Sequence, residues 1–254
     1  SMSLVDWYAQ TIIKRKESLQ KVSNIVVADA FFSKITFIQP LMNEGFHVIS
    51  KLRDDANLRY KFTGEYAGKG RPPHLAGKVN INSLNMNVFT EIKVDENTVA
   101  FYAIVNSKSL KTDILLVVEQ KTDENGKTIQ RLIFSTDTKM NPLEVLEYYH
   151  CRFQMEFNFR DAKQSTGLNH CQARDLDKLH FHFNASLTTV NVAKIIHLND
   201  KNKVGKPFSI ADYKLLYHNA FLLNRFIEAF GIKPKALKSH HHVKELLYFG
   251  TKAA

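Results

Sequence analysis

The chain has 254 residues, of which 44% are hydrophobic and 24% are charged, with two cysteines. This composition excludes a disordered tail, a collagen-like repeat and a disulfide scaffold. Such a length can bury one sizeable core, and we expect one domain with an insertion. Lys and Arg number 35 and Asp and Glu 25, and the formal charge of +10 favours a polyanionic partner such as nucleic acid.

The sequence contains no run close to the roughly 18 to 20 apolar residues that cross a bilayer. The first thirty residues lack the apolar core and cleavage site of a signal peptide, so we expect a cytoplasmic protein with no membrane partner. Cys151 and Cys171 match no metal-ligand spacing and are expected to be free thiols. We interpret His240, His241 and His242 as the solvated start of a helix rather than a ligand set.

Helix and strand signals alternate in the N-terminal part of the chain. An amphipathic helix is expected over residues 7–21, then a β-branched strand at 23–29, a helix at 31–43 and a strand at 46–53. Gly45 marks the end of the second helix. This order is typical of a sheet covered by helices.

A basic, Gly- and Pro-rich loop follows. Residues 51–78 hold seven Lys or Arg against three acidic residues, a local excess of 7 − 3, or +4. Lys69 and Arg71 lie in this loop and are candidate contacts to a phosphate backbone. The loop is not a nucleotide-binding P-loop, because it lacks the Gly-x4-Gly-Lys-Ser/Thr spacing.

Strand signals dominate between about residues 79 and 136. Four short β-rich runs separated by turn residues predict an antiparallel block inserted into the α/β pattern, at 89–94, 98–105, 114–119 and 129–135.

The remainder of the chain is predicted to be helical. Three apolar periodic segments cover residues 143–163, 179–198 and 209–230, and the last begins with a capping-box-like Ser209 and Asp212. The large apolar residues of the last two segments are expected to pack in the core: Leu179, Phe181, Phe183, Leu187, Val190, Ile195, Ile196, Phe221, Leu222, Phe226 and Phe230.

One polar row in the first of these helices is the strongest candidate for chemistry. On a continuous helix, Tyr149, Arg152, Glu156, Arg160 and Lys163 all project within a wedge of about 80°. The row lies between aromatic side chains, which suggests a charged stripe facing a cleft. The alternative is that Glu156 only pairs with the arginines four residues away on either side, on an exposed helix.

Four of these residues match the pattern Tyr-x2-Arg-x3-Glu-x6-Lys: Tyr149, Arg152, Glu156 and Lys163. On this signature the chain resembles the cut-and-paste insertion-sequence transposases of the DDE class, in the family named for insertion sequence four. Residues 26–34 and 45–60 resemble the block around the family's second catalytic aspartate. Residues 132–137 resemble the strand that precedes the glutamate helix.

The resemblance implies an α/β fold, with an RNase H-like catalytic core that is incomplete at its N-terminus. It also implies an inserted antiparallel β subdomain and a helical C-terminal region. Residues 1–60 correspond to a strand–helix–strand part of the core, and residues 61–128 to the basic loop with the inserted β subdomain. Residues 129–200 correspond to the last core strand with the Glu156 helix and the helix after it, and residues 201–254 to the C-terminal helices.

The resemblance also implies a metal site and a DNA-binding surface. Asp29 is the match to the second metal-binding acid and Glu156 to the third, and two Mg²⁺ ions, for which Mn²⁺ can substitute, are the implied cofactors. Candidate DNA contacts are Tyr149, Arg152 and Lys163, supplemented by Arg160, Lys69 and Arg71.

The family's first aspartate has no clear match. Asp6 is the sole acid in residues 1–16 and lies in a helix pattern, so we expect a C-terminal portion of a transposase that is inactive alone. A rival assignment makes Asp29 the first acid, Asp137 the second and Glu156 the third. We rank it lower, because Asp137 resembles a turn residue at a strand end.

The implied function is DNA cleavage and strand transfer at the ends of an insertion sequence. The implied partners are double-stranded DNA at transposon ends and a second copy in a synaptic homodimer, in the nucleoid of a bacterial cytoplasm. Two alternatives stay open: a non-catalytic DNA-binding or dimerising remnant of a transposase, and a helical interaction module formed by residues 179–254.

Overall fold

The computed structural model describes residues 2–65, 68–70, 73–203, 205–231 and 240–252. The chain divides into two compact units, Ser1–Arg152 and Phe153–Ala254. Strands occur only in the first unit among the described residues, and the second unit is helical there.

In the first unit, strands form at all the positions that the sequence predicts: β1 (Ile25–Val27), β2 (His47–Leu52), β5 (Thr90–Lys93), β6 (Thr98–Ser107), β7 (Thr112–Thr122) and β8 (Thr128–Ser135). Two further strands, β3 (Leu58–Lys61) and β4 (Leu75–Lys78), form within residues 51–78, which the sequence predicts to be a basic loop. The accompanying helices are α1 (Leu4–Ile13), α2 (Lys16–Leu19), the short 3₁₀ helix η1 (Ala30–Phe32), α3 (Ile35–Asn43) and α4 (Pro142–Cys151). The helix expected over residues 7–21 is therefore two shorter helices.

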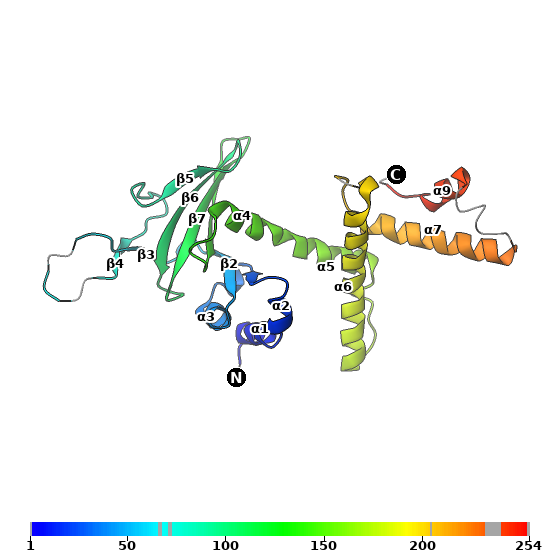
Figure 1. The fold of residues 1–254 in the computed structure, drawn as a ribbon, viewed down its shortest axis with the longest axis horizontal. Helices are drawn as coiled ribbons and strands as arrows, with labels where there is room; N and C mark the ends of the chain where they lie inside the picture. The colour runs from blue at the N-terminus through cyan, green and yellow to red at the C-terminus, as the bar shows by residue number, and fades with distance from the viewer. Residues whose placement is uncertain (1, 66–67, 71–72, 204, 232–239, 253–254) are drawn as a thin grey trace. The chain divides into compact units, whose positions relative to one another are not determined.

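These strands form one sheet in the order β1-β2-β8-β7-β6-β3-β4, and β5 pairs with β6. The β1–β2 pair is parallel and the other pairs are antiparallel. The strands between residues 79 and 136 thus extend the same sheet that contains β1 and β2. Figure 1 shows β2 at one side of this sheet and β3 and β4 at the other.

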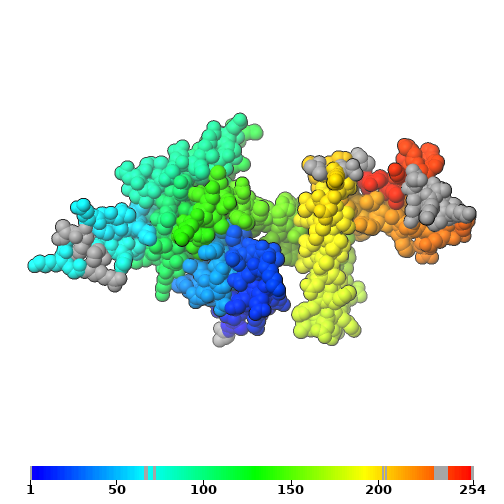
Figure 2. All heavy atoms as spheres, in the orientation of Figure 1, coloured from blue at the N-terminus to red at the C-terminus, as the bar shows by residue number. Residues whose placement is uncertain are grey.

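Successive strand residues point to opposite sides of the sheet, and apolar side chains are buried on both sides. On β7, Leu116 and Val118 belong to the core that also contains residues of α1 and α3. Leu115 and Val117 belong to a second core with residues of α4. In the space-filling view the atoms of α1, α2 and α3 form one packed block, drawn in blue shades (Figure 2). Helix α4 therefore lies on the face opposite α1 and α3.

The second unit consists of α5 (Phe153–Ser165), α6 (Leu176–Asn199), the short 3₁₀ helix η2 (Lys201–Lys203), α7 (Ile210–Ala229) and α9 (His241–Leu247). The expected start of α7 is confirmed: the Ser209 hydroxyl accepts a hydrogen bond from the Asp212 N–H at 3.3 Å. The His240–His242 run begins α9 and is exposed, as expected. Within the described residues, every helix is too short or too polar to traverse a bilayer.

Two expectations need correction. The helix predicted over residues 143–163 is not continuous, because α4 ends at Cys151 and α5 begins at Phe153. The N–H of Arg152, between them, bonds to the carbonyl of Tyr149 at 3.1 Å, a tighter turn than an α-helix makes. The unit boundary falls at the same place, so the five polar residues do not form one stripe within one unit.

The second correction concerns the apolar residues of α6 and α7. Val190 is fully buried, but Phe181 is 76% exposed and Ile195 56% exposed. The aromatic residues expected to pack on α7 are also exposed, namely Phe221, Phe226 and Phe230. The reason is that α6 and α7 are apolar around much of their circumference, and the neighbouring helices of the second unit cover only part of it.

Candidate active site

Asp29 is exposed and lies two residues after the end of β1. Its carboxylate Oδ1 accepts a hydrogen bond from the Phe31 N–H at 2.8 Å, which caps η1. Its backbone carbonyl accepts a hydrogen bond at 2.8 Å from the hydroxyl of Ser50, a fully buried residue of β2. The neighbouring strand therefore fixes the turn that presents Asp29.

The end of α4 brings Tyr149 and Arg152 to this region. Tyr149 is 8% exposed and packs in the core beneath α4, while the Arg152 guanidinium donates a hydrogen bond to its hydroxyl. Burial raises the pKa of Tyr149, and the negative charge of Asp29 raises it further, against the opposing charges of Arg152 and Arg131. Tyr149 and Arg152 are thus in contact within the first unit, and the charge of Asp29 acts on the Tyr149 hydroxyl.

A buried carboxylate that the sequence interpretation missed lies beside this group. Glu119 of β7 has a side chain only 3% exposed, and its two oxygens are paired differently. Oε2 contacts Arg131 Nη1 of β8 at 3.2 Å, and Oε1 contacts His150 Nε2 of α4 at 3.0 Å. The signal for it was an acidic residue directly after the apolar run Ile114–Val118.

Opposing effects act on the ionisation of Glu119. Burial works to raise its pKa, but the hydrogen bond and charge of His150, together with Arg131, outweigh it. The pKa of Glu119 is therefore held below its ordinary value. The carboxylate is ionised at neutral pH, and it keeps Arg131 and the end of α4 in place.

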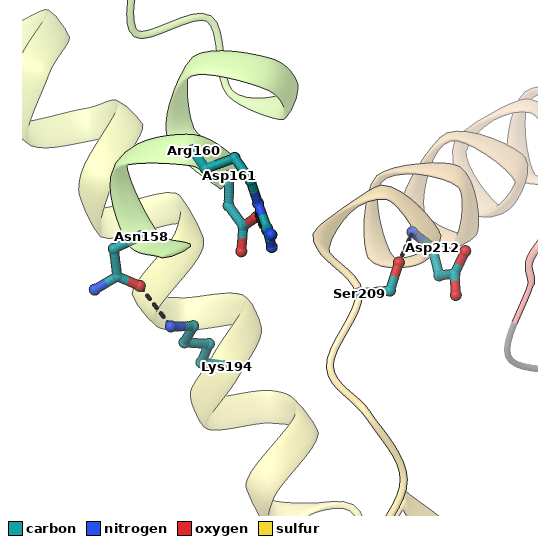
Figure 3. A network of polar contacts seen from close by, with 6 residues as sticks. All are labelled: Asn158, Arg160, Asp161, Lys194, Ser209 and Asp212. Carbon is teal, nitrogen blue, oxygen red and sulfur yellow. Dashed lines mark hydrogen bonds and ion pairs between the residues drawn. The ribbon is translucent and has the colours of Figure 1, made fainter. Parts of the chain in front are cut away.

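The other predicted site residues lie on α5, in the second unit. Glu156 and Lys163 are exposed. Arg160 pairs with the buried Asp161 at 3.0 Å and stacks over the ring of Phe157 at 4.8 Å. Figure 3 shows the Arg160 and Asp161 side chains next to each other. Arg160 therefore has protein partners of its own.

Asn158 and Lys194, also shown in Figure 3, link α5 to α6 by a hydrogen bond between their side chains. This contact, with the packing of Ala162 against Val190, holds α5 on α6. The helix that carries Glu156 is thereby fixed within the second unit.

Three other predicted residues lie elsewhere. Lys69 is exposed in the loop between β3 and β4, and Arg71 lies outside the described residues. Asp137 caps a turn after β8, where its carboxylate accepts the Lys139 N–H at 2.9 Å. A capping bond of this kind is typical of a turn residue.

Asp29 and Glu156 offer carboxylate oxygens, the ligand type that Mg²⁺ prefers. Both side chains are exposed, so neither must leave a buried ion pair to bind a metal. Each carboxylate by itself therefore has the donor chemistry of a ligand for a hard divalent cation, Asp29 in the first unit and Glu156 in the second. Among the described residues, a separate group of close ligand atoms is formed by His241, His242 and Glu245, which are exposed on α9.

Residues 9–192 match the family described as transposase DDE domain. No match to a curated protein was found. The matched range contains Asp29, the strands of the first unit and the α5 helix with Glu156. Because it covers more than half of the chain, the protein belongs to the transposase DDE domain family.

Proposed function

We propose that the chain is the catalytic region of an insertion-sequence transposase, which cleaves DNA and transfers strands at the ends of the element. The observation that carries the proposal is the match of residues 9–192 to the transposase DDE domain family, a range that holds Asp29, Tyr149, Arg152 and Glu156. The Tyr-Arg-Glu-Lys signature supports the finer assignment to the family named for insertion sequence four. An RNase H-like core with an inserted β subdomain is part of the same proposal.

In this proposal Asp29 and Glu156 are two metal-binding carboxylates, and the third acid of the family's triad is left unassigned. The bound Mg²⁺ or Mn²⁺ ions would activate a water or a 3′ hydroxyl and stabilise the leaving oxygen. Arg152 would hold a phosphate of the DNA with its planar fork, and Lys163 would act as a point charge. Tyr149 would orient Arg152 through their hydrogen bond.

The proposed substrate is double-stranded DNA at transposon ends, bound by a homodimer in the synaptic assembly in the bacterial nucleoid. The formal charge of +10 supports a polyanionic partner. The candidate DNA-contacting cations are Arg152, Arg160, Lys163, Lys69 and Arg71.

A nicking assay tests the catalytic proposal. The chain is incubated with supercoiled plasmid DNA and Mg²⁺ or Mn²⁺, and formation of open circles is followed on gels. A complete metal site predicts metal-dependent nicking that falls to background in Asp29→Asn and in Glu156→Gln, because each change removes a negatively charged ligand, whereas a chain without the third acid gives no nicking. Glu147→Gln, an exposed position on α4, serves as the matched control and should nick like the wild type.

Nicking that persists in Glu156→Gln would overturn the assignment of the metal site. A chain that binds duplex DNA in a salt-dependent way but never nicks it would instead favour the second candidate, a non-catalytic DNA-binding remnant of a transposase. The unassigned third carboxylate is the observation that keeps this candidate.

A further inference from the structure

Arg131 and Glu119 form a cross-strand pair. They lie directly opposite each other in the register of β7 and β8, on the same face of the sheet as Val117 and Ile133. The Glu119 side chain is 3% exposed, whereas that of Arg131 is 37% exposed. The carboxylate is therefore buried beneath a guanidinium that reaches the surface.

This pair lies at the end of the sheet where Asp29 is found. β1 and β2 are parallel and both end there, and β8 begins its pairing with β2 at Leu132, one residue after Arg131. The charges of Asp29 and Arg131 both act on the Tyr149 hydroxyl. Arg131 is therefore a second guanidinium, after Arg152, at the end of the sheet that carries the candidate catalytic aspartate.

Fold stability alone gives little reason for a buried carboxylate at position 119. Removing a charge from water is unfavourable, and an apolar residue of similar size often serves a core equally well. Glu119 instead uses each oxygen for a different partner, Arg131 on the sheet and His150 on α4. It thereby fixes the guanidinium and the helix end that carries Tyr149 with respect to each other.

We propose that Arg131 binds a phosphate of the DNA beside Asp29, and that Glu119 is the positioning residue that orients Arg131 and the end of α4. The inference rests on the proposed transposase function and adds two residues to its DNA-binding side. The ligand is a phosphodiester group of duplex DNA. A guanidinium suits it, because its planar fork can donate to Glu119 on one edge and to phosphate oxygens on another.

The direction in which one substitution changes the affinity for DNA distinguishes a positioning role from a simple effect of charge. Glu119→Gln removes a negative charge from the DNA-facing end of the sheet, so charge alone would strengthen binding to a polyanion. If Glu119 orients Arg131, the same change weakens binding, because Gln holds the guanidinium without a charge-assisted bond. A charge effect and a positioning role therefore predict opposite changes in the affinity for DNA.

The test measures the affinity of the full chain for a fluorescein-labelled DNA duplex by anisotropy at several salt concentrations. We expect Glu119→Gln to weaken binding roughly threefold or more and Arg131→Ala by roughly tenfold, the loss of a charge-assisted bond. Arg131→Ala should also reduce the slope of log K against log salt by about 0.9. Arg131→Lys, which keeps the charge but loses the fork, should still weaken binding.

Two comparisons identify a positioning role. Glu147→Gln removes the same charge from the exposed side of α4 and should leave the affinity unchanged or slightly higher. In the Arg131→Ala background, Glu119→Gln should cost less affinity than in the wild type, because one of its two partners is gone. If Glu119→Gln caused only a structural defect, it would lower the affinity by the same factor in the wild type and in the Arg131→Ala variant. Thermal melting identifies unfolded variants, and Arg131→Lys, at a partly exposed position, carries the test if Glu119→Gln does not fold.

Equal or tighter binding by Glu119→Gln, with no effect of Arg131→Ala, would overturn the inference. It would leave the transposase proposal intact, because plasmid nicking by the Asp29 and Glu156 variants tests that separately. A wild-type chain that binds no duplex DNA would overturn both.

Discussion

Ser50 shows how one residue can determine the geometry of a candidate catalytic carboxylate by bonding to the backbone of the same residue. Its hydroxyl bonds to the backbone of Asp29, and the Ser33 hydroxyl lies 2.8 Å away while donating to the carbonyl of Lys51. All these groups lie within a short stretch of β2 and the turn after β1. The exposed carboxylate of Asp29 is therefore mounted on a buried hydrogen-bonded support.

Glu119 gives a prediction for the pH dependence of stability. Its pKa is lowered in the folded protein, so its pairs with His150 and Arg131 stabilise the fold above the pKa of the unfolded state, about 4.3. That contribution is lost as the pH falls through the lowered pKa. Glu119→Gln has no such carboxylate to titrate.

The measurement is the melting temperature of the wild type and of Glu119→Gln between about pH 6 and pH 3. We expect the wild type to lose stability more steeply, so that any advantage over the variant shrinks with acidification. Glu147→Gln provides the comparison for an exposed carboxylate. Parallel curves for the wild type and Glu119→Gln would contradict the prediction.

At the scale of the element, α7 is the helix whose limits the sequence defined best. Ser209 lies just before it, and its end precedes Gly231, which has a positive φ of 60°. The Asp212 carboxylate accepts the Lys252 N–H at 3.1 Å, and so ties the C-terminal segment to the start of α7. The first turn of α7 therefore also holds the C-terminal segment.

Removal of this cap should destabilise the second unit measurably. Ser209→Ala leaves the Asp212 N–H without its acceptor and is expected to cost about 1 kcal/mol of unfolding free energy. Ser209→Asp keeps an acceptor oxygen and should cost much less. Urea denaturation followed by circular dichroism measures both. An equal loss in the two variants would show that the hydrogen bond is not the cause.

Strands were more predictable than the interruption between α4 and α5. Runs of β-branched residues between turn residues located β5 to β8 well, because such runs fit a pleated, half-buried surface. The break at Arg152 has no equivalent signal. Apolar and polar positions continue with helical spacing through it, and nothing in the local sequence resembles Gly or Pro at that point.

For the site, the sequence indicated which residues carry chemistry but not which of them meet. The signature identified Tyr149, Arg152 and Glu156. The structure has the first two in the same unit as Asp29, and Glu156 in the second unit. Glu119 and Arg131 were overlooked because a charged residue in a strand usually points to solvent. Their pairing depends on strand register and on α4, which sequence periodicity does not give.

For the whole molecule, the number of cations that contact DNA sets the salt dependence of binding. The five cations proposed from the signature and the basic loop predict a slope of log K against log salt near −4.5, and Arg131 as a sixth predicts about −5.4. Anisotropy titrations at increasing salt measure this slope. A slope near −1 would mean that the net charge of +10 does not act through these residues.

The position of β2 in the sheet has a consequence for the order of folding. It pairs with β1, which is close in sequence, and with β8, where Ile49 is opposite Ser135. The second pairing closes a long loop, which is entropically costly, while β6, β7 and β8 are joined by tight turns and can form early. We therefore expect a meander of β6 to β8 to form first. Docking of β2 then completes the sheet late, and the turn at Asp29 is among the last parts of the first unit to become ordered.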